Sequence, residues 1–233
     1  MRQEEDNEII RLTMDIRNGK SLPLYKGNDV MIVRAGDMDP GMYLWADQII
    51  VGKNDTRRSI NSQMRKVLFD VEDEKPIEGD KVICLRNSWE TINEVGDVLV
   101  NGLSGTISNI NYNNYNPVLK PMMLADFIPD DYDELDEEFS FGDLYFRQLN
   151  IDYKLLTTGE PTVNEKNFKR FPKGVKPLTF DYGYCITCHK SQGSEYDKVL
   201  VFEEHLKDSQ HARWLYTAAT RAKKKLIIVK DRA

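Results

Sequence analysis

Two segments in the last third of the sequence carry side chains that could bind phosphate. Residues 184–195 read YCITCHKSQGSE, a strand-like run that ends in hydroxyl, imidazole, ammonium and amide groups. Such groups at the end of a strand lie where α/β sheets bind ligands. The expected phosphate donors are Thr187, His189, Lys190 and Ser191, the groups that could meet a nucleotide are Gln192, Ser194 and Glu195, and Gly193 allows close backbone approach. An ordinary polar loop has the same composition, so the segment alone leaves both interpretations open.

The second segment, residues 214–229 (WLYTAATRAKKKLIIV), has the pattern of a helix that runs into a strand. Its inward face is formed by Leu215, Ala218, Ala219 and Ala222. Arg221 stands near the helix end, where its guanidinium could reach the nucleotide of a partner domain. It would there stabilise charge on a transferring phosphoryl group, as an arginine finger does. The alternative is a surface arginine that the helix dipole favours at a helix C-terminus.

The sequence lacks the phosphate loop that would accompany such an arginine, because no G-x-x-x-x-G-K-[ST] pattern occurs in its 233 residues. It does contain C-x-x-C-H, the pattern of haem attachment, at Cys185, Cys188 and His189. Attachment needs an oxidising setting, and in a strand the two cysteines would point to opposite faces. Zinc would need a further ligand from Cys84, His205 or His211, which have no paired spacing. We therefore expect no haem, no zinc and no other metal, but buried structural cysteines.

Charge is unevenly distributed along the chain, whose formal net charge is −6. Residues 126–143 contain nine acids and no lysine or arginine; without them, 32 basic residues stand against 29 acidic ones. Residues 213–232 carry seven basic residues and one acid. Local patches decide phosphate binding, so the net charge does not exclude a nucleic-acid partner. The acidic stretch has no assigned role and is interpreted as a solvated face.

The composition, 40% hydrophobic and 30% charged, is that of a globular protein. No run approaches the roughly 18 apolar residues of a membrane helix. The polar start, MRQEEDNEIIRL, argues against a secretory signal, and three cysteines without such a signal indicate reduced thiols. We expect a cytoplasmic protein with no membrane partner.

The elements that must position these segments have an α/β pattern. We expect a helix over 4–19 with Ile9, Ile10, Leu12, Met14 and Ile16 inward, and a helix over 54–69 capped by Asp55 or Thr56 with Ile60, Met64, Val67 and Leu68 inward. Buried strands are expected over 28–34 and 47–52, further strands over 180–188, 198–203 and 225–230, and a further helix over 209–222. Residues 79–110 differ, since short strands there are broken by Gly, Asn and Asp. VLVNGLSGTI predicts a strand, an Asn-Gly turn and a strand.

Together the two segments resemble motifs V and VI of superfamily 1 helicases, with the RecD-like, 5′→3′ branch the most similar. Met1-Arg2-Gln3 is similar to the M-R-Q segment that opens the second RecA-like domain, and DQIIVGKNDTRRSIN is similar to the strand and helix that follow. VLVNGLSGTI resembles part of the SH3-like barrel that this branch inserts. The resemblance implies a RecA-like motor domain over 1–77 and 177–233, and an inserted SH3-like barrel with an acidic loop region over 78–176.

The resemblance also implies roles for single residues. Arg221 and Arg2 would contact the γ-phosphate; Gln192, Gly193 and Glu195 would face the nucleotide; Thr187, His189 and Lys190 would meet the single-stranded DNA backbone, and Asn54, Thr56 and Arg57 could contact DNA phosphates. Trp89 is a possible DNA contact, but we interpret it as part of the barrel core. An apolar or poorly satisfied patch is expected around Arg2, Gln192 and Arg221, where a partner domain would pack.

The departure from the family is that the first RecA-like domain, which holds ATP and Mg²⁺, has no counterpart here. We therefore expect negligible ATPase activity from the chain alone, and a polypeptide carrying that domain as partner, whether the chain is one product of a split gene, as in compact viral genomes, or a truncated reading frame. The alternative is a catalytically silent module that binds single-stranded nucleic acid.

Overall fold

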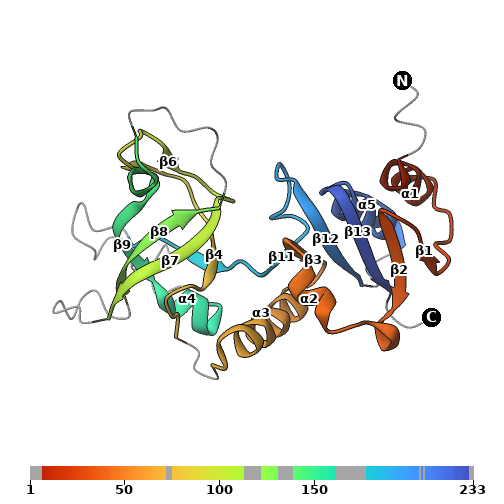
Figure 1. Cartoon of the computed structure of the whole chain (residues 1–233), viewed down its shortest axis with the longest axis horizontal. Coiled ribbons are helices and arrows are strands. Elements are labelled where there is room, and N and C mark those ends of the chain that lie inside the picture. The colour runs from red at the N-terminus through yellow and green to blue at the C-terminus, as the bar shows by residue number, and fades with distance from the viewer. Residues whose placement is uncertain are drawn as a thin grey trace. The chain divides into compact units, whose positions relative to one another are not determined.

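The computed structural model describes residues 7–71, 75–112, 122–130, 139–160, 177–204, 206 and 208–230, apart from the side chains of residues 208 and 209. The chain divides into two compact units, Met1–Met64 with Tyr184–Ala233 and Arg65–Gly183 (Figure 1). The first unit is discontinuous in sequence, and the second is inserted between its two parts. The boundaries expected from the sequence are 77/78 and 176/177.

The first unit is built on a six-stranded sheet. Its elements are α1 (Glu8–Arg17), β1 (Tyr25–Lys26), β2 (Val30–Arg34), η1 (Ala35–Asp37), α2 (Gly41–Trp45), β3 (Gln48–Val51), the start of α3 (Asn54–Phe69), β11 (Cys185–Thr187), β12 (Tyr196–Glu203), α5 (Asp208–Ala219) and β13 (Ala222–Lys230). The strand order is β1-β2-β13-β12-β3-β11, and only the β1–β2 pair is antiparallel. The expected α/β class with a parallel sheet is confirmed.

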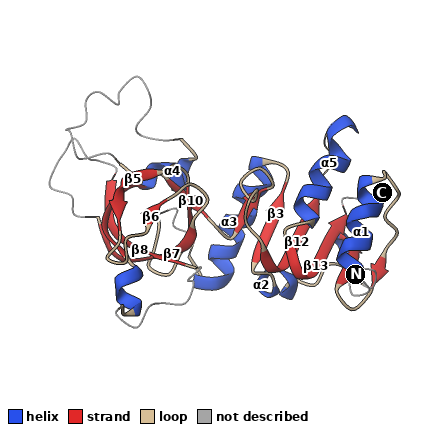
Figure 2. Ribbon diagram, turned by 90° about the horizontal axis from the view of Figure 1, so that it is seen from above, coloured by secondary structure: helices blue, strands red, loops and turns tan. Residues whose placement is uncertain are grey.

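Helices cover this sheet on both faces. The chain passes from β12 through α5 to its neighbour β13, but from β2 through α2 to β3 in the opposite direction across the sheet. Right-handed crossovers therefore place α5 and α2 on opposite faces, as Figure 2 shows. The helix α1 packs against α5 on the same face. Parallel strands covered in this way are buried on both sides, and all four residues of β3 are buried.

The first helix shows where the sequence pattern was misread. The side chain of Asn7 caps α1 by accepting hydrogen bonds from the backbone N–H groups of Ile9 and Ile10. The buried positions are Ile9, Thr13 and Ile16, whereas Ile10 and Met14 are exposed. A spacing of four and then three residues follows one helix face, so the expected inward positions of Ile10 and Met14 were wrong. Residues 4–6 of the expected helix lie outside the described residues.

The helix α3 agrees with its expected range, since it covers Asn54–Phe69. It begins at Asn54, so Asp55 and Thr56 lie inside its first turn and the expected cap was misplaced. Ile60 and Met64 are buried as expected, but Val67 and Leu68 are exposed.

The strand expected over 180–188 is in fact two strands in different sheets. Phe180–Tyr182 (β10) pairs with β4 of the second unit, and β11 pairs with β3 of the first. The chain leaves one unit and enters the other between Gly183 and Tyr184. A continuous apolar run cannot reveal such a change of partner, because both strands are buried.

The second unit is predominantly antiparallel β. Its elements are β4 (Lys81–Cys84), β5 (Ser88–Ile92), β6 (Val98–Leu99), β7 (Ser104–Asn111), β8 (Met122–Pro129), η3 (Phe141–Leu144), β9 (Phe146–Asp152), α4 (Tyr153–Thr158) and β10. Five strands form a sheet in the order β10-β4-β7-β8-β9, and β5 and β6 form a separate pair. The core contains Phe127, whose ring lies 6.1 Å from that of Phe146 and 5.1 Å from that of Phe180.

The five-stranded sheet is curved, but no continuous ladder of hydrogen bonds joins its two edge strands. A single bridge joins Ile151 of the edge strand β9 to Leu178, which precedes the opposite edge strand β10. The N–H of Asp152 donates to the carbonyl of Leu178 at 2.9 Å, and the N–H of Leu178 donates to Asn150 at 2.7 Å. The described strands therefore form no closed barrel. The expected strand, Asn-Gly turn and strand are present as β6, Asn101-Gly102 and β7, but the two strands do not pair with each other, because β6 pairs with β5.

One member of the acidic stretch has a structural role. The buried carboxylate of Asp126 accepts the backbone N–H of Gln148 at 2.7 Å and the side-chain amide of Asn109 at 3.3 Å. Asn109 and Gln148 both have positive φ, and the pairing registers shift nearby. Asp126 thus holds two bulges that bend the sheet, and the solvated-face interpretation was wrong for this residue. Residues 131–138 of the stretch lie outside the described residues.

Candidate functional site

Two polar segments leave the first unit's sheet together. Thr187, the last residue of β11, is the register partner of Val51, the last residue of β3. The N–H of Cys188 donates to the carbonyl of Val51 at 2.9 Å. Residues 52–57 and 188–190 therefore start side by side at the carboxyl edge of the sheet, where α/β proteins bind ligands. Together with Thr187 at the end of β11, these segments contain the six residues to which the resemblance assigned contacts with the DNA backbone.

The turn after β11 is held by backbone and hydroxyl hydrogen bonds. The carbonyl of Thr187 accepts the N–H groups of Lys190 at 2.8 Å and Ser191 at 3.2 Å. The hydroxyl of Ser191, which is fully buried, donates to the carbonyl of Cys188 at 2.8 Å. As a result Thr187 is buried, Lys190 is half-buried and His189 is exposed. Of the three, His189 is the most accessible to a ligand.

Glu204, which the sequence analysis missed, dominates the electrostatics of the neighbouring turn. It follows β12 directly and is buried. Its Oε2 accepts the N–H groups of Gly52 at 2.6 Å and Lys53 at 2.7 Å, and its Oε1 accepts the hydroxyl of Thr56. A carboxylate at a helix N-terminus satisfies free N–H groups and opposes the helix dipole. Glu204 thus occupies the place where an anion would bind at the start of α3.

The other two residues predicted in this turn contact each other. The Nε of Arg57 donates to Oδ1 of Asn54 at 3.3 Å. Arg57 is buried, whereas Asn54 is exposed. Asn54 is therefore the member of the predicted trio Asn54, Thr56 and Arg57 that faces solvent. The sequence did contain a signal for Glu204. This residue comes directly after β12, and Asn54 comes shortly after β3, so both lie at the same edge of the sheet.

Arg221 lies at the opposite end of the strands, immediately before β13. Its guanidinium donates to three neutral oxygens: the carbonyls of Thr217 at 3.1 Å and Ser194 at 3.2 Å, and the hydroxyl of Thr220 at 3.2 Å. The side chain is half-buried, and within the described part of the chain no carboxylate pairs with it. Its positive charge is therefore oriented without being neutralised.

The segment expected to face the nucleotide runs past Arg221. Gln192, Gly193 and Glu195 are exposed, and Gly193 has φ +91°, a conformation that favours glycine. The carbonyl of Arg221 accepts the N–H of Tyr196 at 2.9 Å. Residues 192–195 and Arg221 thus meet at the amino ends of β12 and β13. Arg2 lies outside the described residues.

The cysteines are buried, as predicted. Burial raises the pKa of the Cys188 thiol to about 11, although the Arg221 guanidinium opposes this shift. Among the described residues, no group of three or more His, Cys, Asp or Glu side chains is placed to hold a metal ion.

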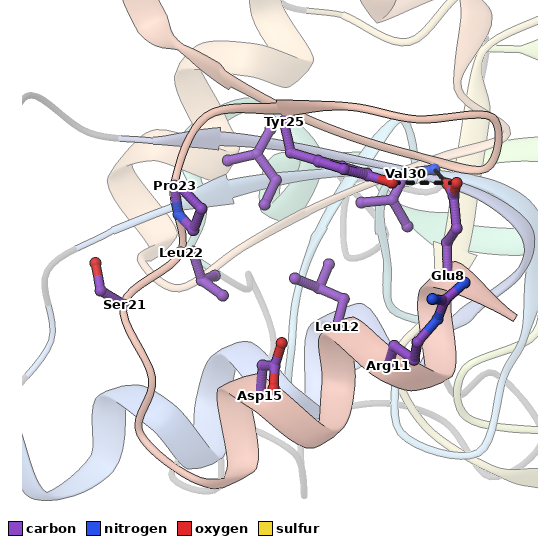
Figure 3. A pocket seen from close by; sticks show the side chains of 10 residues that line it. Glu8, Arg11, Leu12, Asp15, Ser21, Leu22, Pro23, Tyr25 and Val30 are labelled. Atoms are coloured by element: carbon purple, nitrogen blue, oxygen red, sulfur yellow. Dashed lines mark hydrogen bonds between the residues drawn. The ribbon is translucent and has the colours of Figure 1, made fainter. Parts of the chain in front are cut away.

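Two adjoining hollows lie along α1. The first, about 200 Å³, is walled by apolar side chains such as Leu12, Leu22 and Ile32 (Figure 3). At its end the Glu8 carboxylate accepts the backbone N–H groups of Asn28, Asp29 and Val30. The second, about 420 Å³, contains the Glu203–His211 pair, whose Oε1 and Nε2 lie 2.9 Å apart. None of the residues predicted for nucleotide or DNA lines either hollow.

Of the apolar or poorly satisfied patch expected around Arg2, Gln192 and Arg221, the described residues show no apolar form, but the Trp214 Nε1 is buried without a hydrogen-bond partner and Arg2 lies outside them. Over residues 187–195 and 214–221 the structure exposes no large apolar side chain. None of the helices in the described ranges combines the length and apolar character needed to cross a bilayer.

The site segments coincide with a known family signature. Residues 182–229 match the family model of the UvrD-like helicase C-terminal domain. This range includes β11, the turn after it, β12, α5 and Arg221. A comparison with curated protein sequences finds no match.

The fold is similar to that of solved Pif1 helicases. The chain superposes on the Pif1 helicase of Candida albicans with a TM-score of 0.51 and 15% identity, covering 98% of this chain and 54% of that one. For the Bacteroides Pif1 helicase in complex with ADP-AlF3 and ssDNA, the TM-score is 0.50 at 16% identity, with 99% and 50% covered. A Pif1 structure that addresses unwinding at forked dsDNA gives 0.53 at 14% identity, with 96% and 47% covered.

The matches cover only part of each helicase. The chain spans about half the length of the helicases that it resembles. The structural likeness establishes the fold, and the family model identifies the segment that carries Arg221. Residues 182–229 of this chain thus match the UvrD-like helicase C-terminal domain, and the chain has a fold similar to that of about half of each of these solved Pif1 helicases.

Proposed function

We propose that this chain is the C-terminal motor portion of an ATP-dependent 5′→3′ DNA helicase of the RecD-like branch. It would act with a polypeptide that supplies the first RecA-like domain. The observation that carries this proposal is the state of Arg221, a half-buried guanidinium held by three neutral oxygens with no carboxylate partner in the described chain. A charge oriented in this way attracts an anion, and a γ-phosphate is the anion that the family segment suggests.

The nucleotide would be shared between two polypeptides. ATP and Mg²⁺ would be bound mainly by the first RecA-like domain, where the phosphate loop supplies N–H groups and a lysine. This chain would contribute Arg221 to the terminal phosphate, with Arg2 aimed at the same group. Gln192, Gly193 and Glu195 are exposed beside Arg221, which is consistent with a role in facing the nucleotide.

The DNA grip would lie at the carboxyl edge of the sheet, away from Arg221. Exposed His189 and Asn54 and half-buried Lys190 would contact the backbone of single-stranded DNA. Thr187, Thr56 and Arg57 would support these contacting residues from within the turn, because they are buried or hydrogen-bonded there. Two sites at opposite ends of the same strands suit a domain that couples nucleotide hydrolysis to movement on a strand.

The second unit would be the SH3-like insertion of this branch. Its curled five-stranded sheet, with one bridge between Ile151 and Leu178 across the edges, supports this assignment. We further propose that the protein acts in the cytoplasm of a bacterial or phage-infected cell, in DNA replication, recombination or repair.

The test is reconstitution in trans. The chain is mixed with a polypeptide carrying the first RecA-like domain of a superfamily 1 helicase, and ATP hydrolysis is measured with and without oligo(dT). We expect negligible turnover from either part alone and DNA-stimulated turnover from the mixture. Arg221→Ala should lower that turnover by about a hundredfold or more. Arg213→Ala, which changes an exposed arginine on α5, the helix that precedes Arg221, is the matched control.

Other results of these assays would contradict particular parts of the proposal. Full turnover by the Arg221→Ala mixture would refute the arginine finger. Binding of oligo(dT) without turnover in any mixture would instead support a catalytically silent nucleic-acid-binding module. Displacement assays on 5′-tailed and 3′-tailed duplexes test the direction, and activity only on the 3′-tailed substrate would contradict 5′→3′ movement.

A further inference from the structure

The strands β5 and β6, which are labelled in Figure 2, form a pair in the second unit. This pair and the residue after it expose large apolar side chains. Trp89 is 68% exposed and Ile92 is 57% exposed on β5, and Val100, which follows β6, is 37% exposed. The interpretation of Trp89 as core was therefore wrong. We call Trp89, Ile92 and Val100 the Trp89 surface.

The fold of this pair does not depend on the Trp89 surface. Leu99 of β6 is fully buried and anchors the pair in the unit's core. The side chain of Asn93 donates to the carbonyl of Leu144 at 3.1 Å and accepts the N–H of Asp97 at 2.7 Å. The N–H of Glu94 donates to the carbonyl of Asp143 at 3.2 Å. The turn between the strands is thus fixed by buried and polar contacts, and Trp89 and Ile92 remain outside.

These exposed side chains would contribute hydrophobic free energy to binding if a partner covered them. Burying one large apolar side chain is worth roughly 1.5–3 kcal/mol, and exposed tryptophans are enriched among the residues that dominate protein interfaces. Trp89 and Ile92 lie on β5 and Val100 directly follows β6, and the register of these paired strands joins Ser88 to Leu99 and Ile92 to Val98. They are therefore close enough to be covered by one partner segment.

The charges around the Trp89 surface are mainly negative. Glu90, Glu94 and Asp97 are exposed on the same strands and turn, and Arg86 is the one basic residue within 86–100. Asp143, next to Glu94, is also acidic, and hydrogen bonds from Ser140 lower its pKa so that it stays ionised near neutral pH. Such a rim attracts lysine and arginine and repels phosphate.

We propose that the Trp89 surface is a docking site for a basic, apolar polypeptide segment, in which aliphatic or aromatic side chains cover Trp89 and Ile92 while lysines or arginines pair with Glu94 and Asp97. This site lies outside the helicase signature and goes beyond the proposed motor function. Single-stranded DNA fits it less well, since bases could stack on Trp89 only by bringing phosphates to the acidic rim.

The probe is a fluorescein-labelled amphipathic Leu/Lys peptide, and fluorescence anisotropy of the label reports its binding to the full chain. We expect saturable binding that Trp89→Ala and Ile92→Ser each weaken by about tenfold or more. Glu94→Gln with Asp97→Asn should weaken binding at low salt and have less effect at high salt. Leu44→Ala, which removes an exposed leucine of the first unit, is the matched control.

Three results would overturn the proposal. The first is unchanged affinity in both Trp89→Ala and Ile92→Ser, with circular dichroism showing that each variant is folded. The second is binding of a Leu/Glu peptide with the same affinity as the Leu/Lys peptide, because the acidic rim would then not discriminate between basic and acidic segments. The third is quenching of tryptophan emission by oligo(dT) that disappears in Trp89→Ala, together with loss of oligo(dT) binding in that variant, which would make this surface a nucleic-acid site. None of these results depends on ATP hydrolysis, so they leave the proposed motor function untouched.

Discussion

Arg221 donates a hydrogen bond from Nη1 to the backbone carbonyl of Ser194 at 3.2 Å. This contact joins the end of α5 to the polar segment that follows β11, although 27 positions separate the two residues. A second bond runs in the opposite chain direction, from the N–H of Tyr196 to the carbonyl of Arg221. The two segments that carry the family signature therefore hold each other in place, and a shift of one would move the other.

Replacing Arg221 by lysine tests whether the positive charge of this residue is enough, or whether its hydrogen-bonding geometry is also needed. Lysine keeps the positive charge but cannot donate to Thr217, Ser194 and Thr220 at once, because its ammonium lacks the planar guanidinium fork. In the reconstituted mixture we expect Arg221→Lys to lower ATP turnover nearly as much as Arg221→Ala, while thermal unfolding changes little. Turnover close to the unmodified level would show that charge alone suffices.

Neutralising Glu204 should have two opposite effects. In Glu204→Gln the start of α3 loses the carboxylate that accepts from Gly52, Lys53 and Thr56, so unfolding free energy should fall by about 1–2 kcal/mol. The same change removes a negative charge beside Asn54 and Lys53. We therefore expect oligo(dT) affinity, measured by fluorescence anisotropy at low salt, to rise several-fold.

The control for this prediction is Glu203→Gln, which alters the preceding residue at the end of β12. Its carboxylate contacts His211 and not α3, so oligo(dT) affinity should not change. If Glu204→Gln lowers stability without raising affinity, the start of α3 is not part of the DNA grip.

The sequence predicted the first unit better than the second, for a physical reason. Parallel strands covered on both faces, such as β3 and β12, leave continuous β-branched runs that can be read directly. Antiparallel pairing is set by contacts between distant residues, so the sequence did not reveal that β6 pairs with β5. The break at Gly183, where the chain changes sheet, lies inside an apolar run and has no local signal.

The candidate site was predictable in residue type but not in burial. The spacing of polar groups after β11 located the turn, yet Thr187 is buried and His189 exposed because the turn folds back on the Thr187 carbonyl. Glu204 and Asp126 were missed as buried carboxylates, since acidic residues are usually solvated. Trp89 was misplaced for the converse reason, because an aromatic side chain does not reveal which side of a strand it occupies.

A buried ion pair makes Asp80 critical for the stability of the second unit. The Arg65 guanidinium donates to both carboxylate oxygens of Asp80, at 2.9 and 3.1 Å, and lies 4.6 Å from the centre of the Tyr182 ring. Asp80→Asn would remove the carboxylate charge that pairs with the buried Arg65 guanidinium and should lower unfolding free energy by about 3–5 kcal/mol. Urea denaturation measures this loss.

The comparison variant for Asp80 is Asp130→Asn in the same unit. Asp130 pairs with Lys81 at 3.4 Å, and both side chains are partly exposed. Its loss should amount to less than about 1 kcal/mol. Similar losses in both variants would show that the Arg65–Asp80 pair contributes no more than a surface ion pair.

Gly105 should tolerate no side chain, because β7 passes directly over the core of the second unit. A Cβ at this position would collide with the backbone carbonyl of Ile128 and lie 2.7 Å from the ring of Phe127. Both neighbours are fixed, one as backbone and one as a fully buried aromatic. We expect Gly105→Ala to lower unfolding free energy by about 1–3 kcal/mol. Gly36→Ala, where nothing lies within 4 Å, should cost far less.

The buried thiols should make stability depend on alkaline pH. Burial raises the pKa of Cys84 from 9.0 to about 11, so between these values the unfolded chain loses a proton that the folded chain keeps. Since the unfolded state then binds fewer protons, unfolding free energy falls as pH rises through this window. Chemical denaturation at pH 8 and pH 10 should therefore show a smaller decrease for Cys84→Ser than for the unmodified chain, because serine does not titrate there. Equal decreases in the two proteins would mean that Cys84 ionises as readily in the folded state as in the unfolded state.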